Sequence, residues 1–174
     1  EGLLNDHIRS LAVDNQGRLW AGTDKGLYFY SPEKNNFVLF GAENYFRAVE
    51  SLAVAHDGAL WVSGEDGLYQ VDKSSERLIK VALDGEAVTS LNIYGQSLFL
   101  VVNGQKVHQI TGEAHLVKTK FIGQTNQRVV DVEVLGKDNM LVATSNGVMQ
   151  VSEGQIIKIF PAIHPIWPNF YKLP

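Results

Sequence analysis

The chain has 174 residues, of which 45% are hydrophobic and 20% are charged, a balance typical of a globular domain. Its 15 Lys and Arg residues stand against 19 Asp and Glu residues, and the net charge of -4 disfavours binding to the phosphate backbone of nucleic acids. There is no apolar run of the roughly 20 residues that a membrane-spanning helix needs, and the absence of cysteine excludes disulfides, thiolate metal ligands and thiol nucleophiles.

The first unit, residues 2–41, contains four short apolar stretches divided by turn residues. The expected strands are residues 8–13, 19–23, 27–30 and 37–40. Gly17 and Gly26 fall between the first three strands, where tight hairpins require a positive φ. The unit therefore predicts one four-stranded antiparallel sheet.

The second unit, residues 42–81, repeats the first almost intact. Residues 10–28 read SLAVDNQGRLWAGTDKGLY and residues 51–69 read SLAVAHDGALWVSGEDGLY, so Gly58, Trp61 and Gly67 take the places of Gly17, Trp20 and Gly26. A sheet with two apolar faces must be covered on both sides. We therefore expect Trp20 and Trp61 to pack between neighbouring sheets rather than to serve as ligand platforms.

Two weaker copies follow, over residues 82–119 and 120–160. Phe99 and Leu141 stand in the place of the Trp, and Lys106 replaces the second glycine of the third copy. Units of four short strands that recur about every 40 to 45 residues are typical of propeller blades. The chain is thus expected to be all-β, a β-propeller of four four-stranded antiparallel blades that is either partial or small.

The ends of the chain suggest a piece of a longer protein. The sequence begins with Glu1 and the first repeat is under way at Gly2. Residues 161–174 are rich in proline and aromatic residues, which excludes a helix or a central strand and fits the start of a next blade or a strap over the last one. Blades in an open arc would expose apolar faces, so we expect either a tight four-bladed closure or further blades or a second copy of the chain that cover them.

The first unit resembles the two-component regulator propeller repeat, whose pattern runs roughly V-x-x-I-x-x-D-x-x-G-x-L-W-I-G-T-x-x-G-L-x-x-Y. Residues 8–30 read IRSLAVDNQGRLWAGTDKGLYFY; in the second unit Ala55 replaces the Asp, and Ser63 and Gly64 replace Gly-Thr. In that family such repeats form the extracytoplasmic sensor region of bacterial membrane proteins that carry kinase or diguanylate cyclase domains. The resemblance implies a ligand-sensing module in the periplasm.

Candidate ligand-binding residues lie on the loops that lead into the innermost strands of the blades, because propellers bind ligands mainly at the mouth of the central channel. They are Asn5, His7, Arg9, Tyr45, Phe46, Arg47, Gln127 and Arg128. The cluster Tyr45-Phe46-Arg47 is the most suggestive, since aromatic faces and an Arg fork suit a carbohydrate or an anionic small-molecule ligand. The alternative is that Phe46 anchors its loop and that the polar residues are ordinary solvated surface.

Catalytic, metal-binding and cofactor motifs are not recognisable. The five histidines have no His-x-x-x-His spacing, and no nucleophile elbow occurs. The turns at Asp14 and Asp57 resemble the Asp-box hairpins of sialidases, but Leu19 and Leu60 stand where the threonine of that motif precedes Trp. We therefore expect a non-catalytic binding module without cofactor or metal; the alternatives are a propeller enzyme, a glycosidase or a lyase, and a protein-interaction scaffold.

Overall fold

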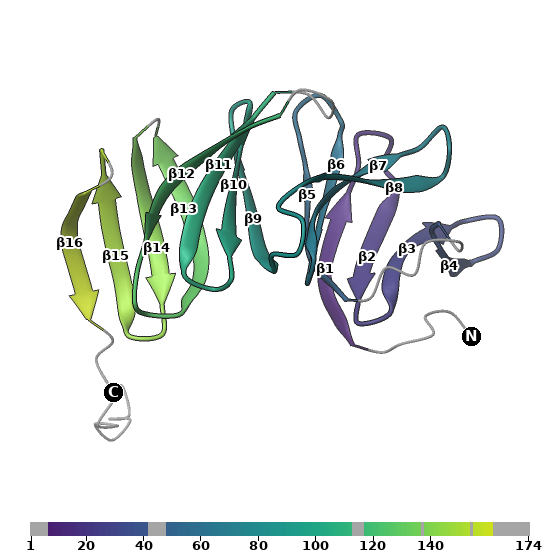
Figure 1. The fold of residues 1–174 in the computed structure, drawn as a ribbon. Helices are drawn as coiled ribbons and strands as arrows, with labels where there is room; N and C mark the ends of the chain where they lie inside the picture. The colour runs from purple at the N-terminus through teal and green to yellow at the C-terminus, as the bar shows by residue number, and fades with distance from the viewer. Residues whose placement is uncertain (1–6, 42–47, 113–116, 137, 154, 162–174) are drawn as a thin grey trace, which may run out of the picture.

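The structure is a computed structural model that describes residues 7–41, 48–112, 117–136, 138–153 and 155–161. Over these ranges the chain forms sixteen β-strands and no helix. The strands make four antiparallel sheets of four strands each (Figure 1).

Each sheet is a meander in which strands that follow one another in the sequence are paired. The first sheet contains β1 (Ile8–Val13), β2 (Leu19–Thr23), β3 (Gly26–Ser31) and β4 (Asn36–Leu39). The second contains β5 (Val49–Val54), β6 (Leu60–Gly64), β7 (Gly67–Asp72) and β8 (Arg77–Ala82). The third contains β9 (Val88–Tyr94), β10 (Ser97–Val102), β11 (Lys106–Thr111) and β12 (Lys118–Gln124), and the fourth β13 (Val129–Gly136), β14 (Asn139–Thr144), β15 (Gly147–Ser152) and β16 (Gln155–Pro161).

The sheets pack as consecutive blades of a propeller. The first strands of neighbouring sheets contact one another, β1 with β5, β5 with β9 and β9 with β13, and the second strand of each blade contacts the first strand of the next. The first strands are thus the innermost ones, and the four blades form an arc with β1–β4 at one end and β13–β16 at the other (Figure 1). The predicted all-β propeller fold is confirmed.

Two boundaries between blades lie later in the chain than expected, since β8 of the second blade includes Ala82 and β12 of the third blade extends to Gln124. Strand β12 pairs with β11 of the third blade and runs across the expected boundary between residues 119 and 120. Most of β12 is exposed, because it is the outermost strand of its blade, and its sequence KTKFIGQ carries little apolar periodicity. The fourth blade accordingly begins at Val129 and ends with Pro161, which pairs with Gly147.

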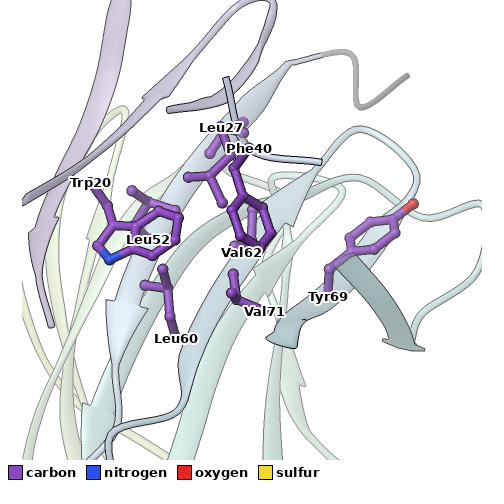
Figure 2. Packing of buried hydrophobic residues seen from close by; sticks show 9 residues of the cluster. Trp20, Leu27, Phe40, Leu52, Leu60, Val62, Tyr69 and Val71 are labelled. Atoms are coloured by element: carbon purple, nitrogen blue, oxygen red, sulfur yellow. The ribbon is translucent and has the colours of Figure 1, made fainter. Parts of the chain in front are cut away.

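Blades 1 and 2 meet at an apolar core around Trp20. The Trp20 side chain is fully buried, its ring meets the Phe40 ring edge-on at a centroid distance of 5.2 Å, and it lies beside Leu52 and Leu60 of blade 2 (Figure 2). Gly22 belongs to this contact, because a Cβ at this position would overlap the Val49 side chain. The expected packing role of Trp20 agrees with this placement.

The other two interfaces have the same construction with different side chains. Trp61 packs against Leu98 and Ile110 of blade 3, and Phe99 packs against Met140 of blade 4. Phe99 therefore fills the position of the Trp, as its place in the repeat suggests. The absence of Trp from the third and fourth copies therefore did not change the blade architecture.

The expected hairpin glycines have the backbone that the turns require. Gly17, Gly26, Gly58 and Gly67 have φ values of 77°, 124°, 86° and 146°. At Gly67 a side chain would also be crowded, because a Cβ would lie 3.0 Å from the carbonyl oxygen of Ala82.

A buried carboxylate joins blades 1 and 2 at the turns. Asp14 Oδ1 accepts hydrogen bonds of 3.0 Å from the backbone N–H groups of Gln16 and Arg18, and Oδ2 accepts one of 3.0 Å from Trp20 Nε1 and one of 2.9 Å from Lys73 Nζ of blade 2. Burial alone would raise the pKa of Asp14, but these four donors lower it to about 2. We call Asp14, Trp20 and Lys73 the Asp14 strut.

Candidate functional site

The topology sorts the loops onto two edges of the propeller. The connections from the second to the third strand of each blade, and those from one blade to the next, share one edge, which we call the entry edge. The turns after the first and third strands share the opposite edge, the turn edge. Of the eight candidate ligand-binding residues, the four that the structure describes, His7, Arg9, Gln127 and Arg128, lie at or next to the entry edge.

Arg9 organises the entry edge of blades 1 and 2. Its Nε donates to the Asp24 carboxylate and its Nη1 donates to Glu50 Oε2 at 2.6 Å, while His7 Nδ1 lies 3.4 Å from Asp24 Oδ2. The hydrogen bond to Asp24 and the charge of Glu50 raise the pKa of Arg9, although partial burial opposes this. Because two carboxylates face one guanidinium, this cluster carries net negative charge and suits a neutral or cationic group.

Blade 3 presents a second polar group on the same edge. The Asn103 side chain accepts a hydrogen bond of 3.0 Å from the backbone N–H of Ala87 and donates one of 3.4 Å to Glu86 Oε1. Lys106 Nζ lies 3.5 Å from the same Glu86 oxygen. From the sequence, Lys106 was identified only as the replacement of a glycine. The other three blades have glycine at this position, so the charged side chain of Lys106 could have indicated a role on this edge.

Gln127 and Arg128 lie where the chain enters blade 4. Gln127 Oε1 accepts a hydrogen bond of 2.6 Å from Thr144 Oγ1, so this side chain is held in place. Arg128 is exposed, and its guanidinium has no ion pair or hydrogen bond with any residue that the structure describes. Arg128 is therefore available to pair with an anionic group at this edge.

The candidate residues fall into two groups. The contacts of His7 and Arg9 are with blades 1 and 2, and those of Gln127 are with blade 4. Asn5, Tyr45, Phe46 and Arg47 lie outside the described residues and stay predictions.

The innermost strands carry a signal that sequence reasoning missed. Polar side chains 41 residues apart meet across neighbouring blades, as Arg9 does with Glu50 and as Asn92 Nδ2 does with Glu133 Oε2 at 3.1 Å. The separation equals the repeat length, so the contact partners can be found by placing the copies of the repeat one under another. Within the described ranges no three His, Asp or Glu side chains converge as a metal-binding group, and no helix is long and apolar enough to span a membrane.

Comparison with protein families identifies the first repeat. Residues 2–25 match the family described as two component regulator propeller. The resemblance that the sequence of the first unit suggests is thereby confirmed. No curated protein sequence matches the chain significantly.

Solved structures share the fold at low sequence identity. The extracellular domain of a proposed hybrid two component system, BT4673 from B. thetaiotaomicron, matches with a TM-score of 0.75 and 19% identity over 95% of this chain and 24% of that one. The corresponding domain of BT3049 from the same organism matches with a TM-score of 0.74 and 13% identity over 94% of this chain and 25% of that one. Virginiamycin B lyase from Staphylococcus aureus matches with a TM-score of 0.69 and 14% identity over 91% of this chain and 57% of that one. The chain thus spans about a quarter of the first two structures.

Proposed function

We propose that the chain is a non-catalytic, ligand-sensing part of a larger β-propeller in the extracytoplasmic region of a bacterial sensor of the two-component or diguanylate-cyclase type, located in the periplasm. The observation that carries the proposal is the match of residues 2–25 to the two component regulator propeller family. It is supported by the likeness of the fold to the extracellular domains of two sensor systems.

The end of blade 1 supports the presence of a preceding blade or of another covering surface. Leu11 of β1 is 59% exposed, whereas the equivalent residues Leu52, Leu91 and Val132 of the other blades are 8%, 9% and 1% exposed. Each of these three is covered by the blade before it, and Leu11 has the same apolar character without such a cover. A row of exposed apolar side chains at the end of an arc favours a continuing propeller.

The entry edge supports binding of a polar small molecule or a carbohydrate. Arg128 offers an unpaired guanidinium, and the carboxylates around Arg9 offer acceptors for hydroxyl groups. A ligand held by loops of several blades would favour one arrangement of those blades over another. Binding would in this way alter the packing of the propeller against its neighbouring domains.

Calorimetric titration of the purified chain with neutral monosaccharides and with sugar acids tests the proposal. We expect saturable binding that the exchange Arg128→Ala weakens about tenfold for a sugar acid, the loss of one charged hydrogen bond. The exchange Lys120→Ala on the exposed outer strand β12 removes a positive charge elsewhere and should leave binding unchanged. Equal affinity of both variants and the native chain would refute a site at Arg128.

An enzyme is the second candidate, because virginiamycin B lyase shares the fold. Chromatography of the same mixtures after prolonged incubation separates the two candidates. A sensor returns its ligand unchanged, whereas a lyase or a glycosidase yields products. A scaffold propeller would bind none of these molecules.

A further inference from the structure

The Asp14 strut has no counterpart between blades 2 and 3. At the turn between β5 and β6, Ala55 stands in the place of Asp14 and Ala59 in the place of Arg18. The backbone of the turn is nevertheless the same, since Ala55 N donates to Ala59 O at 2.8 Å as Asp14 N donates to Arg18 O at 3.0 Å. The two exchanges therefore remove a carboxylate and a guanidinium without altering the turn.

Blade 3 lacks the partner cation as well. Lys73 directly follows β7, and the residue that directly follows the equivalent strand β11 is Gly112. The first hairpin of blade 3 is also shorter, with only Gly95 and Gln96 between β9 and β10. The charged side chains of the turn and the partner lysine are thus missing, and the facing hairpin is shorter, at one place on the turn edge.

The space that these side chains would occupy is a pocket of about 620 Å³. It is lined by Ala55, His56, Asp57, Trp61, Ile93, Gly95, Gln96, Ser97, Leu98, Ile110, Thr111 and Gly112. This volume is in the usual range of small-molecule sites, about 300 to 1,000 Å³. The pocket lies on the edge opposite to the loops from which the candidate ligand-binding residues come.

Trp61 supplies a hydrogen-bond donor to this pocket. The equivalent indole N–H of Trp20 donates to Asp14, and Arg18 lies over the Trp20 ring at 5.6 Å from its centroid. Trp61 has neither partner: its N–H makes no hydrogen bond with any residue the structure describes, although only 5% of its surface is exposed. The Trp61 nitrogen is not among the buried side-chain atoms that lack a partner, so it is accessible to solvent where Trp61 lines the pocket, and an oxygen atom of a bound molecule can accept its hydrogen bond in place of water.

The charge of the lining restricts the kind of molecule. No lysine or arginine is among the described lining residues, and the carboxylate there is Asp57, whose Oδ1 accepts a hydrogen bond of 2.9 Å from Ala59 N. An anion would face Asp57 without a counter-cation. A cation would gain little from Asp57, which is exposed and already accepts a backbone hydrogen bond, and would lose hydration against the apolar side chains of the pocket. Ile93, Leu98 and Ile110 supply an apolar wall.

We propose that this pocket, between blades 2 and 3 at the turn edge, binds a small uncharged molecule whose apolar body lies against Ile93 and Ile110 and whose oxygen accepts the hydrogen bond of the Trp61 indole. The ligand oxygen takes the position that the Asp14 carboxylate has in blade 1. The site is independent of the proposed function, which rests on the entry edge.

Indole ¹H–¹⁵N NMR spectra of the full chain test this site, because the Trp61 signal is assigned by its loss in Trp61→Phe. Cyclohexanol, cyclohexanecarboxylate and cyclohexylammonium serve as probes with one body and three charge states. We expect cyclohexanol to shift the Trp61 signal saturably without moving that of Trp20, with an affinity at least about fivefold above those of the two ions. Tighter binding of either ion would overturn the proposed ligand class.

The exchange Ala55→Asp gives Trp61 the carboxylate that Trp20 has and takes up space in the pocket, whereas Gly112 is left unchanged because a side chain at its φ of 102° would be strained. We expect cyclohexanol to bind this variant at least about tenfold more weakly, while Thr119→Asp, which adds the same charge on the exposed strand β12, keeps the native affinity. Unaltered affinity of the Ala55→Asp variant would place the bound probe elsewhere and refute the site. If that variant does not fold, binding of cyclohexanol to Trp61→Phe can be measured from the ¹H signals of cyclohexanol itself. We expect this binding to be about fivefold weaker than binding to the native chain. Arg128→Ala should have no effect here, so failure of this site and failure of the proposed function are distinguishable.

Discussion

Lys73 of blade 2 donates a 2.9 Å hydrogen bond to the carboxylate of Asp14 in blade 1, so that one buried charge holds a hairpin and joins two blades. The carboxylate is fully enclosed, while the Lys73 side chain reaches it from a partly exposed turn. Asp14 belongs to the motif of the first repeat, and its partner comes from 59 residues further along the chain.

Loss of the Asp14 carboxylate should destabilise the chain substantially. Asp14→Ala leaves the indole N–H of Trp20 and two backbone N–H groups without an acceptor, and we expect the free energy of unfolding in urea to fall by about 2 to 3 kcal/mol. Asp57→Ala removes a turn carboxylate of blade 2 that is exposed and accepts one backbone hydrogen bond, and it should cost less than about 1 kcal/mol. Equal losses in the two variants would contradict the role of the strut.

The strut also predicts a stability change in acid. The pKa of Asp14 is about 2 in the folded chain and 3.8 ordinarily, because its four donors favour the charged form. Its contribution is therefore complete above pH 3.8 and is lost as the pH falls through about 2. Urea midpoints measured between pH 5 and about 2 should fall more steeply for the native chain than for Asp14→Asn.

His108 gives a second pH dependence, at higher pH. Both ring nitrogens are buried without a hydrogen-bond partner among the described residues, and the ring meets Phe121 edge-on at 5.4 Å. Burial lowers the pKa of His108 below the ordinary value of 6.5, and the charge of Lys106 adds to this while Glu86 opposes it. The folded state thus prefers the neutral ring, and its stability is complete above pH 6.5 and declines as the pH falls through and below that value.

Replacement of the ring isolates this effect. Between pH 7.5 and about 5 the free energy of unfolding of His108→Leu should vary less with pH than that of the native chain. His56→Leu, at an exposed position of a turn, serves as the control for the replacement of a histidine by leucine. An unchanged slope in His108→Leu would show that this ring does not bind the proton.

Close packing between blades 1 and 2 should reject a single methyl group at Gly22. Because a Cβ there overlaps Val49, we expect Gly22→Ala to cost about 1 to 3 kcal/mol in the free energy of unfolding. Gly123 of β12 provides the control, since a Cβ at that position has no atom within 4 Å, and Gly123→Ala should leave stability unchanged or slightly raised. A tolerated Gly22→Ala would mean that the blades can separate at this point.

The exposed position Leu11 tests the proposal that blades or other surfaces continue the arc. In the chain alone Leu11→Lys should change stability by less than about 0.5 kcal/mol, whereas Leu52→Lys at the equivalent buried position should cost several kcal/mol. In a longer native chain that includes the preceding segment, Leu11→Lys should become similarly destabilising. A harmless Leu11→Lys in the longer chain would argue against a preceding blade.

The fold was predictable because its determinants are local and repeated. The apolar alternation and the turn glycines of residues 8–30 define one blade, and the near copy at residues 51–69 defines the next. The third and fourth blades lack the Trp, and their assignment depended on the repeat length.

The candidate sites were less predictable, because they depend on residues of different blades. The pairing of Arg9 with Asp24 and Glu50 uses the carboxylates of a turn and of the next blade, so a residue that looked available for an anion is already occupied. The pocket beside Trp61 arises from small residues at positions 55 and 112, and small residues carry no signal of their own. Only the placement of one blade against the next reveals what is missing there.

The ladder of polar contacts along the innermost strands makes the blades non-interchangeable. Arg9 of blade 1 meets Glu50 of blade 2, and Asn92 of blade 3 meets Glu133 of blade 4, so blades 1 and 3 each offer a side chain that complements the next blade. A tandem copy of blade 1 inserted after itself would set Arg9 against a second arginine, and the repulsion would oppose that order. The repeats share one architecture, while the polar contacts between their innermost strands favour the observed order of the blades.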